Sequence, residues 1–77
     1  MHPPLLKKES FMRFRRLREL RLKNELTQKD VADILNCTQS CYSQYERGLR
    51  DIPTSVLIAL ADFYRTSVDY LLGRTSH

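Results

Sequence analysis

The sequence predicts an all-α protein, with five short helices in one domain. A chain of 77 residues is long enough for one hydrophobic core and too short for two. Its 42% of hydrophobic and 29% of charged residues, with two glycines and three prolines, are typical of a globular chain rather than a disordered one. Apolar residues recur every three or four positions, and no segment has the alternating pattern of a β-strand.

The first expected helix runs from Phe11 to Lys23. Arginines fill most of its polar positions, and its apolar side chains recur at three-residue intervals: Phe14, Leu17 and Leu20. This is the pattern of an amphipathic helix. We expect Asn24 to end the helix in the left-handed conformation, and Leu26 to return the chain to the core.

The second expected helix runs from Gln28 to Leu35. Thr27 is its N-cap, and Asp30 stands where a capping box needs an acidic or amide side chain. The residues expected to face the core are Val31, Ala32, Ile34 and Leu35. Asn36 tolerates positive φ better than other non-glycine residues, so the helix should stop there in a tight turn.

The third expected helix runs from Gln39 to about Arg47. Thr38 supplies its N-cap, and Gly48 ends it. Its inward side chains should be Tyr42 and Tyr45.

Two further helices follow a loop at Leu49–Pro53. We expect Thr54 to cap a helix that continues through Tyr64, and a short last helix over Val68–Leu72 that stops at Gly73. In the longer of these two helices, the residues expected to face the core are Leu57, Leu60 and Ala61. The expected organisation is an N-terminal extension at 1–10, a folded domain at 11–73 and a C-terminal tail at 74–77.

The positive charge is concentrated in the first part of the chain. The net charge is +4, with a pI near 9.4, and residues 1–30 carry nine Lys or Arg against four acids. Residues 31–77 carry four Lys or Arg against five acidic residues. A cationic surface attracts polyanions such as nucleic acid or an anionic membrane. The alternative is a solvated helix face that only aids solubility.

Several classes of protein are excluded by what the sequence lacks. No stretch approaches the roughly 20 apolar residues of a membrane span, and the first residues do not form a secretory signal, so we expect a cytoplasmic protein. The chain has no internal histidine, no glycine-rich phosphate loop and no nucleophile constellation. We therefore expect no enzyme, no cofactor and no small-molecule ligand. Cys37 and Cys41 lack further metal ligands nearby, so buried, unreactive thiols are favoured over a metal or redox site.

The segment from Thr27 to Gly48 meets the requirements of a helix-turn-helix. Two helices of about two turns are joined by a three-residue turn, the first helix has the small Ala32 for close packing, and Asn36 permits the left-handed bend. The inward positions are apolar or aromatic: Val31, Leu35, Cys37, Tyr42 and Tyr45.

Four motifs in this order resemble one family of bacterial and phage regulators. They are L-T-Q-K-D-V-A-D-I-L-N at 26–36, S-Q-Y-E-R-G at 43–48, I-P-T at 52–54 and L-A-D-F-Y at 60–64. They resemble the lambda-repressor-like, Cro-type (XRE family) regulators, over about Arg13 to Arg74. The resemblance implies a five-helix DNA-binding domain, generally of a transcriptional repressor, whose third helix reads DNA.

The polar side chains of the third helix are candidates for contact with bases. They lie on faces that the two tyrosines do not occupy: Gln39, Ser40, Ser43 and Gln44. Glutamine pairs with adenine through two hydrogen bonds, and serine bonds to several base edges. The resemblance implies base contacts at Gln39, Ser40 and Gln44. The alternative is that these side chains merely solvate an exposed helix.

The resemblance also implies a phosphate contact and a structural ion pair. Gln28, at the start of the second helix, matches the family's phosphate clamp, and the further phosphate candidates are Lys29, Thr38, Tyr45, Arg47 and Arg50. Arg21 and Glu46 match a pair that fixes the third helix against the first. We expect double-stranded DNA as the partner, bound by a homodimer on a two-fold operator, with the loop at Leu49–Ile52 and the final helix in the dimer contact.

The sequence departs from the family at three positions. Glu25 and Asn36 stand where the family usually has glycine, and Tyr42 replaces an isoleucine or valine, adding a hydroxyl that must find a partner. The alternative function is an antitoxin-like protein-interaction module. Its support is the aromatic and apolar tail: Phe63, Tyr64, Tyr70, Leu71 and Leu72.

Overall fold

The computed structural model describes residues 14–76, which form five helices and, within that range, no strand. In chain order they are α2 (Arg15–Lys23), α3 (Gln28–Leu35), α4 (Gln39–Glu46), α5 (Thr54–Tyr64) and α6 (Val68–Leu71). The expected all-α class is thereby confirmed. The expected start of the first helix at Phe11 and the 1–10 extension lie outside the described residues.

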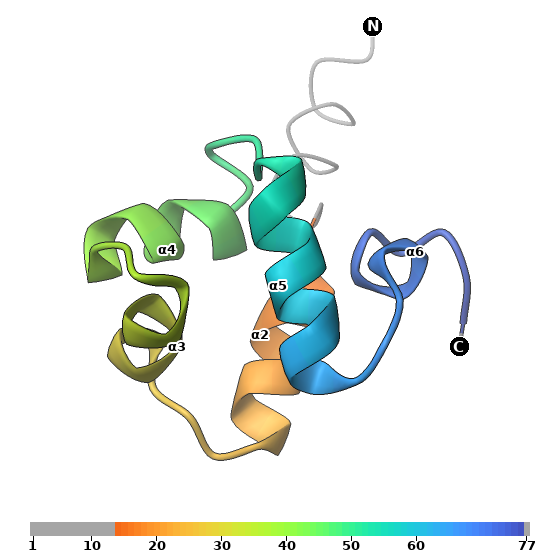
Figure 1. Ribbon diagram of the computed structural model, residues 1–77, viewed down its shortest axis with the longest axis horizontal. Helices are drawn as coiled ribbons and strands as arrows, with labels where there is room; N and C mark the ends of the chain where they lie inside the picture. Colours follow the sequence, from red (N-terminus) through yellow and green to blue (C-terminus); the bar gives the residue numbers. More distant parts are fainter. Residues whose placement is uncertain (1–13, 77) are drawn as a thin grey trace, which may run out of the picture.

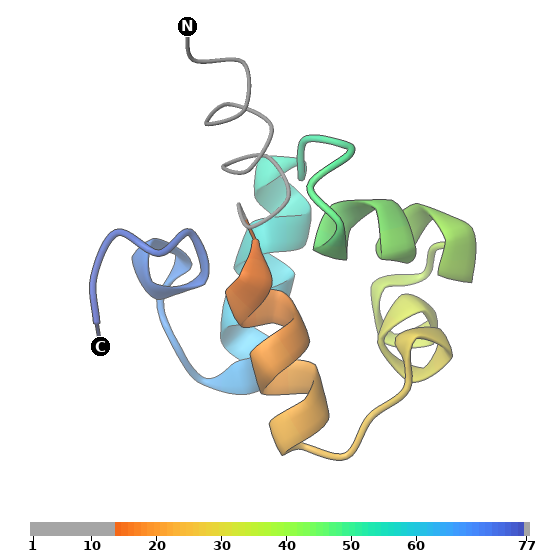
Figure 2. The same cartoon turned by 180° about the vertical axis from the view of Figure 1, so that it is seen from behind.

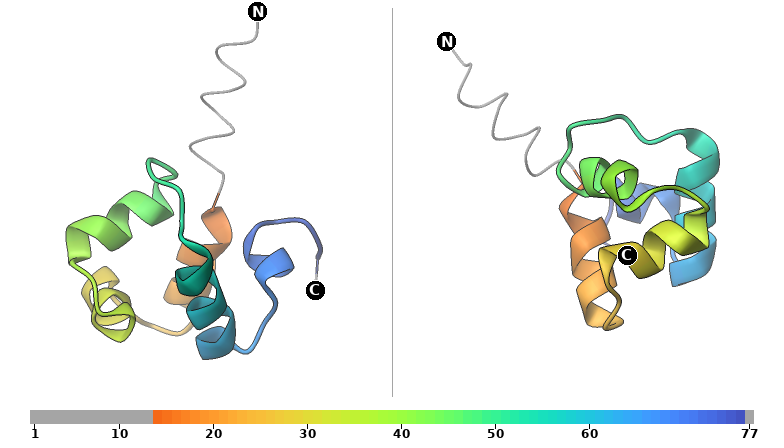
Figure 3. Two further views of the ribbon diagram at one scale, coloured as in Figure 1. Left: turned by 45° about the horizontal axis from the view of Figure 1, so that its top comes forward. Right: turned by 90° about the vertical axis from the view of Figure 1, so that its left-hand side faces the viewer.

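The helices surround one core. Figures 1 and 2 show α3 and α4 on one side of the α2 and α5 pair and α6 on the other. In the right-hand view of Figure 3, α2 and α5 lie apart, with α3 running across between them and α4 seen nearly end-on above it. Every helix and the α4–α5 loop contribute buried apolar side chains, which are Phe14, Leu17, Val31, Ala32, Tyr42, Tyr45, Ile52, Leu60, Ala61 and Leu71. No helix within residues 14–76 has the length and apolar character needed to cross a bilayer.

The N-terminal ends of α3 and α4 are capped as the sequence predicts. The Thr27 hydroxyl accepts from the Asp30 backbone N–H at 3.0 Å, and the Asp30 carboxylate accepts from the Thr27 N–H at 2.8 Å, which completes the capping box. Thr38 caps α4 by accepting from the Cys41 N–H at 3.0 Å.

The prediction that Thr54 caps α5 is wrong. Thr54 is already the first helical residue, and the N-cap is Pro53, with φ −57° and ψ 148°. A proline ring holds φ near this value, so Pro53 fits the extended N-cap position without a side-chain hydrogen bond. Its carbonyl accepts from the Leu57 N–H at 3.0 Å and begins the helix.

All five helices end with one residue of positive φ. These residues are Glu25, Asn36, Gly48, Arg65 and Gly73. At each end the residue after it donates its N–H to a carbonyl five positions back, as in the bond from Cys37 to Ala32 at 2.9 Å, which is the Schellman arrangement. The expected stops at Asn36, Gly48 and Gly73 are confirmed.

The stop expected at Asn24 is displaced by one residue. Asn24 has φ −94°, and Glu25 takes the left-handed conformation with φ 59°. The bond from the Leu26 N–H to the Arg21 carbonyl, at 3.0 Å, requires the reversal at Glu25. The Asn24 side-chain amide instead donates to the Leu20 carbonyl at 2.7 Å.

Ile34 is also misplaced by the sequence prediction, because 46% of its surface is exposed. Val31 and Ala32 are buried and Leu35 packs against them, which sets the centre of the inward face of α3. Ile34 lies on the far side of Val31 from Ala32, beyond the edge of that face.

Candidate nucleic-acid interface

A tight turn holds α4 against α3. Asn36 has φ 60° and ψ 44°, and Thr38 has returned to the extended conformation before α4 begins. Ala32 is 1% exposed, so the small side chain permits close packing between the two helices. Figure 3 shows α4 leaving the turn at a steep angle to α3.

The face of α4 away from the core carries the four polar residues expected to contact bases. Gln39 and Ser40, in the first turn, are exposed, and Ser43 and Gln44, in the second turn, are half-buried. Tyr42 and Tyr45 occupy the opposite face, where their rings meet edge to face at 6.5 Å. The first turn of α4 is therefore its most accessible polar surface.

The residues expected to contact phosphate are in different environments. Lys29 is exposed and lies 3.5 Å from Asp33, one turn further along α3. Arg47, the C-cap of α4, and Arg50, in the following loop, are both exposed. The Thr38 hydroxyl is occupied as an acceptor by its cap. Tyr45 is only 5% exposed, so its ring belongs to the core rather than to the exposed surface of α4.

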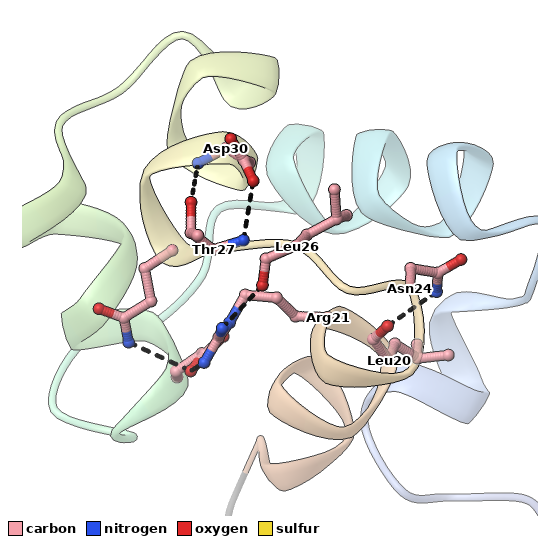
Figure 4. Close-up of polar contacts among 8 residues, drawn as sticks. Leu20, Arg21, Asn24, Leu26, Thr27 and Asp30 are labelled. Carbon is pink, nitrogen blue, oxygen red and sulfur yellow. Dashed lines mark hydrogen bonds and ion pairs between the residues drawn. The ribbon is translucent and has the colours of Figure 1, made fainter.

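An ion pair beneath α4 joins it to α2. The Arg21 Nε donates to the Glu46 Oε2 at 2.6 Å, and Nη2 donates to Oε1 at 3.2 Å. Arg21 Nη1 donates to the Leu26 carbonyl at 3.0 Å, so the guanidinium of this α2 residue binds both α4 and the loop between α2 and α3 (Figure 4). A bidentate pair fixes orientation as well as distance. The hydrogen bond to Glu46 is the main cause that raises the pKa of Arg21.

Gln28 is connected to the same carboxylate. Its side-chain amide donates to the Glu46 Oε1 at 3.3 Å. Burial would raise the pKa of Glu46, but the interactions with Arg21, Tyr42 and Gln28 outweigh it, and the pKa lies below its usual range. Glu46 is therefore ionised at neutral pH and holds the first residue of α3 as well as the end of α4.

Two buried hydroxyls lie beside this network. Neither Tyr42 nor Tyr64 makes a hydrogen bond through its Oη, although Tyr42 lies near the Glu46 carboxylate. Burial is the main cause that raises the pKa of Tyr42, and it raises the pKa of Tyr64 to about 12. The Tyr42 hydroxyl thus has the Glu46 carboxylate as its polar neighbour, but without a hydrogen bond of full geometry. Packing of its ring in the core, at 0% exposure, decides its position.

Sequence reasoning missed the role of Arg16, which it placed among the residues of a cationic face. Its guanidinium lies 4.1 Å from the centroid of the Tyr70 ring and donates to the Tyr70 carbonyl at 2.8 Å. A further bond goes to the Thr75 carbonyl. These partners are more than 50 residues away in sequence, and no local pattern indicates them. Arg16 therefore fastens α6 and the following residues to α2.

The thiols differ from the expectation of burial. Cys37 and Cys41 are both half-buried, and Arg50 Nη1 donates to the Cys41 Sγ at 3.0 Å.

Of the five tail residues that favoured an interaction module, only Phe63 is exposed, at 42%. Leu71 is buried, and the other three are half-buried.

The arrangement of α3, the turn and α4 defines a helix-turn-helix domain. The helix-turn-helix family model matches residues 17–71, and the chain belongs to that family. This confirms the resemblance seen in the sequence.

Relatives from Bacillus subtilis (strain 168) are named as regulators of the same type. The chain is 45% identical over 60 residues to the HTH-type transcriptional regulator ImmR, covering 78% of this chain and 47% of ImmR. It is 41% identical over 63 residues to the HTH-type transcriptional regulator AnsR, covering 82% of this chain and 54% of AnsR. The chain thus spans about half the length of these curated relatives.

Proposed function

We propose that this protein is a sequence-specific DNA-binding transcriptional regulator that represses by occupying its operator. The observation that carries the proposal is the outward polar face of α4, on a helix fixed from below by the Arg21–Glu46 pair. Membership of the helix-turn-helix family and the printed names of the relatives support it. An α-helix fits the major groove, where base edges differ between all four base pairs.

Gln39 and Gln44 are the proposed main base contacts. The amide of glutamine matches the N6 and N7 positions of adenine. Ser40 and Ser43 would add single hydrogen bonds beside them. The exposure of Gln39 and Ser40 at the start of α4 supports the first turn as the part that enters the groove deepest, as in other helix-turn-helix proteins.

The proposed phosphate contacts surround this helix. Arg47 and Arg50 lie at its C-terminal end, and Lys29 and Thr38 lie at the starts of α3 and α4. Gln28 is the first residue of α3, where backbone N–H groups lack helical acceptors and attract an anion. In the free protein the Gln28 amide is held by Glu46, which presets its position.

A homodimer on a two-fold operator is the proposed binding form. Leu49 follows the end of α4 directly and is 61% exposed, the largest value among the exposed large apolar residues. Ile52, in the same loop, is buried and contributes to the core instead. The two half-sites of such an operator, each read by one α4, would lie about one duplex turn apart, roughly 34 Å.

Selection of bound sequences from a random DNA pool tests the proposal. Once the operator is known, Gln39→Ala and Gln44→Ala should each cost about 1–3 kcal/mol, at one base position each. Arg50→Ala should weaken binding to all sequences alike and reduce the salt slope by about one. Arg74→Ala is the matched control for the loss of one charge, because Arg74 is exposed and its N–H bonds to Asp69 in α6. Figure 1 shows α6 on the other side of α5 from α4.

Equal losses on operator and random DNA for both glutamine variants would refute their role as base contacts. Binding that does not weaken as salt rises would refute the nucleic-acid function itself and favour the interaction module.

A further inference from the structure

The Arg50 side chain reaches the sulfur of Cys41, and the Cys37 and Tyr45 side chains are close enough to it for their pKa values to respond. Arg50 Nη1 donates to it at 3.0 Å. Burial and then the neighbouring Cys41 thiol raise the pKa of Cys37, and a hydrogen bond with Cys41 is the main cause that raises the pKa of Tyr45. Cys41 therefore lies at the centre of a small polar cluster of Cys37, Cys41, Tyr45 and Arg50, which we call the thiol cluster.

The position of Cys41 is that of a reactive rather than a structural cysteine. It is half-buried, lies in the first turn of α4 with its N–H bonded to the Thr38 cap, and has a guanidinium beside its sulfur. Partial exposure lets a small reagent reach the sulfur, and reactive cysteines typically lie in electropositive surroundings of this kind. Cys37 has the weaker case, because burial raises its pKa.

We propose that Cys41 is a modification site for low-molecular-weight disulfides, with Cys37 as the resolving thiol, and that its modification releases the protein from DNA. The release rests on the DNA-binding function proposed above. The site itself rests on the geometry of the thiol cluster alone.

The chemistry is a pair of thiol–disulfide exchanges. The Cys41 thiolate attacks one sulfur of the small disulfide, whose S–S bond breaks; one half stays on Cys41, and the other leaves as a thiolate that takes up the proton lost by Cys41. Cys37 then gives up its proton and attacks the Cys41 sulfur, and the second half takes up a proton and leaves as a thiol. The two cysteines lose two electrons, and the small disulfide gains them.

Either product disturbs the proposed DNA surface. A group on the Cys41 sulfur would take the place of the Arg50 guanidinium. It would project from the first turn of α4, one turn before Gln44. A bond between Cys37 and Cys41 ties the turn to the first turn of α4, which carries the exposed Gln39 and Ser40. Both changes act on the part of α4 proposed to contact DNA.

Glutathione disulfide is the probe for the site, with intact mass as the readout. The wild-type protein should first gain one glutathione and then lose it, ending two hydrogen masses lighter. Cys37→Ser should stop at the adduct, and Cys41→Ser should react at least about tenfold more slowly. Arg50→Gln should slow the reaction of Cys41, whereas Arg47→Gln, the matched exposed arginine, should not.

The same samples are then tested for binding to the selected operator. Oxidised wild-type protein should bind at least about tenfold more weakly than reduced protein, with recovery on adding a dithiol. Cys41→Ser should show the same affinity with and without the probe. Equal reaction rates of Cys41→Ser and wild type, or unchanged DNA affinity of the modified protein, would overturn the proposal. If reduced protein binds no DNA, the proposed function fails, while the mass measurement still judges the thiol site.

Discussion

Replacing Glu46 with glutamine tests how much of the stability depends on the ion pair beneath α4. The side chains of Arg21 and Glu46 are 10% and 4% exposed. The substitution keeps the shape of the side chain but removes its charge, so the Arg21 cation stays buried without an anion. Removing one partner of a buried pair costs about 3–5 kcal/mol. A domain of this size has a free energy of unfolding of roughly 4–12 kcal/mol, so the variant should lose a large part of it.

Urea denaturation followed by far-UV circular dichroism measures this loss. The control is Glu19→Gln, because Glu19 forms a pair with Arg15 at 3.7 Å in which both side chains are 60% exposed. An exposed pair contributes about 0.5 kcal/mol or less. The double variant Arg21→Met with Glu46→Leu should recover most of the stability, since apolar residues of similar volume replace the pair. Similar small losses for Glu46→Gln and Glu19→Gln would refute the reasoning.

The same pair makes stability depend on pH. The pKa of Glu46 is lower in the folded protein than its ordinary value of 4.5, so the unfolded chain binds more protons between the two values. The contribution of Glu46 is therefore complete above about pH 4.5 and is lost as the pH falls through the folded pKa. The stability difference between wild type and Glu46→Gln should shrink over that interval. A difference that stays constant down to about pH 3 would contradict this assignment.

Four further substitutions probe the rest of the fold. Arg65→Gly should raise the free energy of unfolding by about 1 kcal/mol, because Arg65 has φ 55°, which glycine adopts without strain. Gly73→Ala should lower the free energy of unfolding by about as much, since the added Cβ meets nothing within 4 Å and only the backbone cost of positive φ remains. A shift of the opposite sign in urea denaturation would contradict either prediction. Tyr42→Phe should leave stability unchanged or raise it by about 1 kcal/mol, because the buried hydroxyl that it removes makes no hydrogen bond of full geometry. A clear loss would show that the interaction of this hydroxyl with Glu46 stabilises the fold. Arg16→Met should speed amide hydrogen exchange in α6 more than in α3, because the Arg16 guanidinium contacts the carbonyl and ring of Tyr70 in α6. Equal exchange rates in α6 of the variant and the wild type would show that Arg16 does not hold this helix.

Helix boundaries followed from the sequence wherever a local signal decides them. Thr27 with Asp30, Thr38, Asn36 and Gly48 each carry the chemistry of a cap or a stop within their own few residues. These four signals surround the turn, so the helix-turn-helix was the best predicted part of the chain.

Several failures arose where a contact with another residue, and not the residue's own preference, decides the outcome. Whether Asn24 or Glu25 reverses the chain depends on the bond that Leu26 makes to Arg21, and not on the preference of asparagine. The partners of Arg16 and the sulfur contact of Arg50 are likewise set by packing between elements. A cationic side chain in a sequence therefore predicts charge, but it does not predict whether that charge is free to meet a polyanion.

Arg21 explains why a glutamate is tolerated at the left-handed position after α2. The backbone strain at Glu25 is of the order of 1 kcal/mol, and the usual remedy is glycine. Here the Leu26 N–H donates to the Arg21 carbonyl while the Arg21 guanidinium donates to the Leu26 carbonyl, both at 3.0 Å, so the reversal is closed from both sides. The guanidinium is in turn held by Glu46. The strain at Glu25 and the orientation of α4 thus depend on one side chain, and Glu25→Gly should stabilise the wild-type protein without changing how α4 is held.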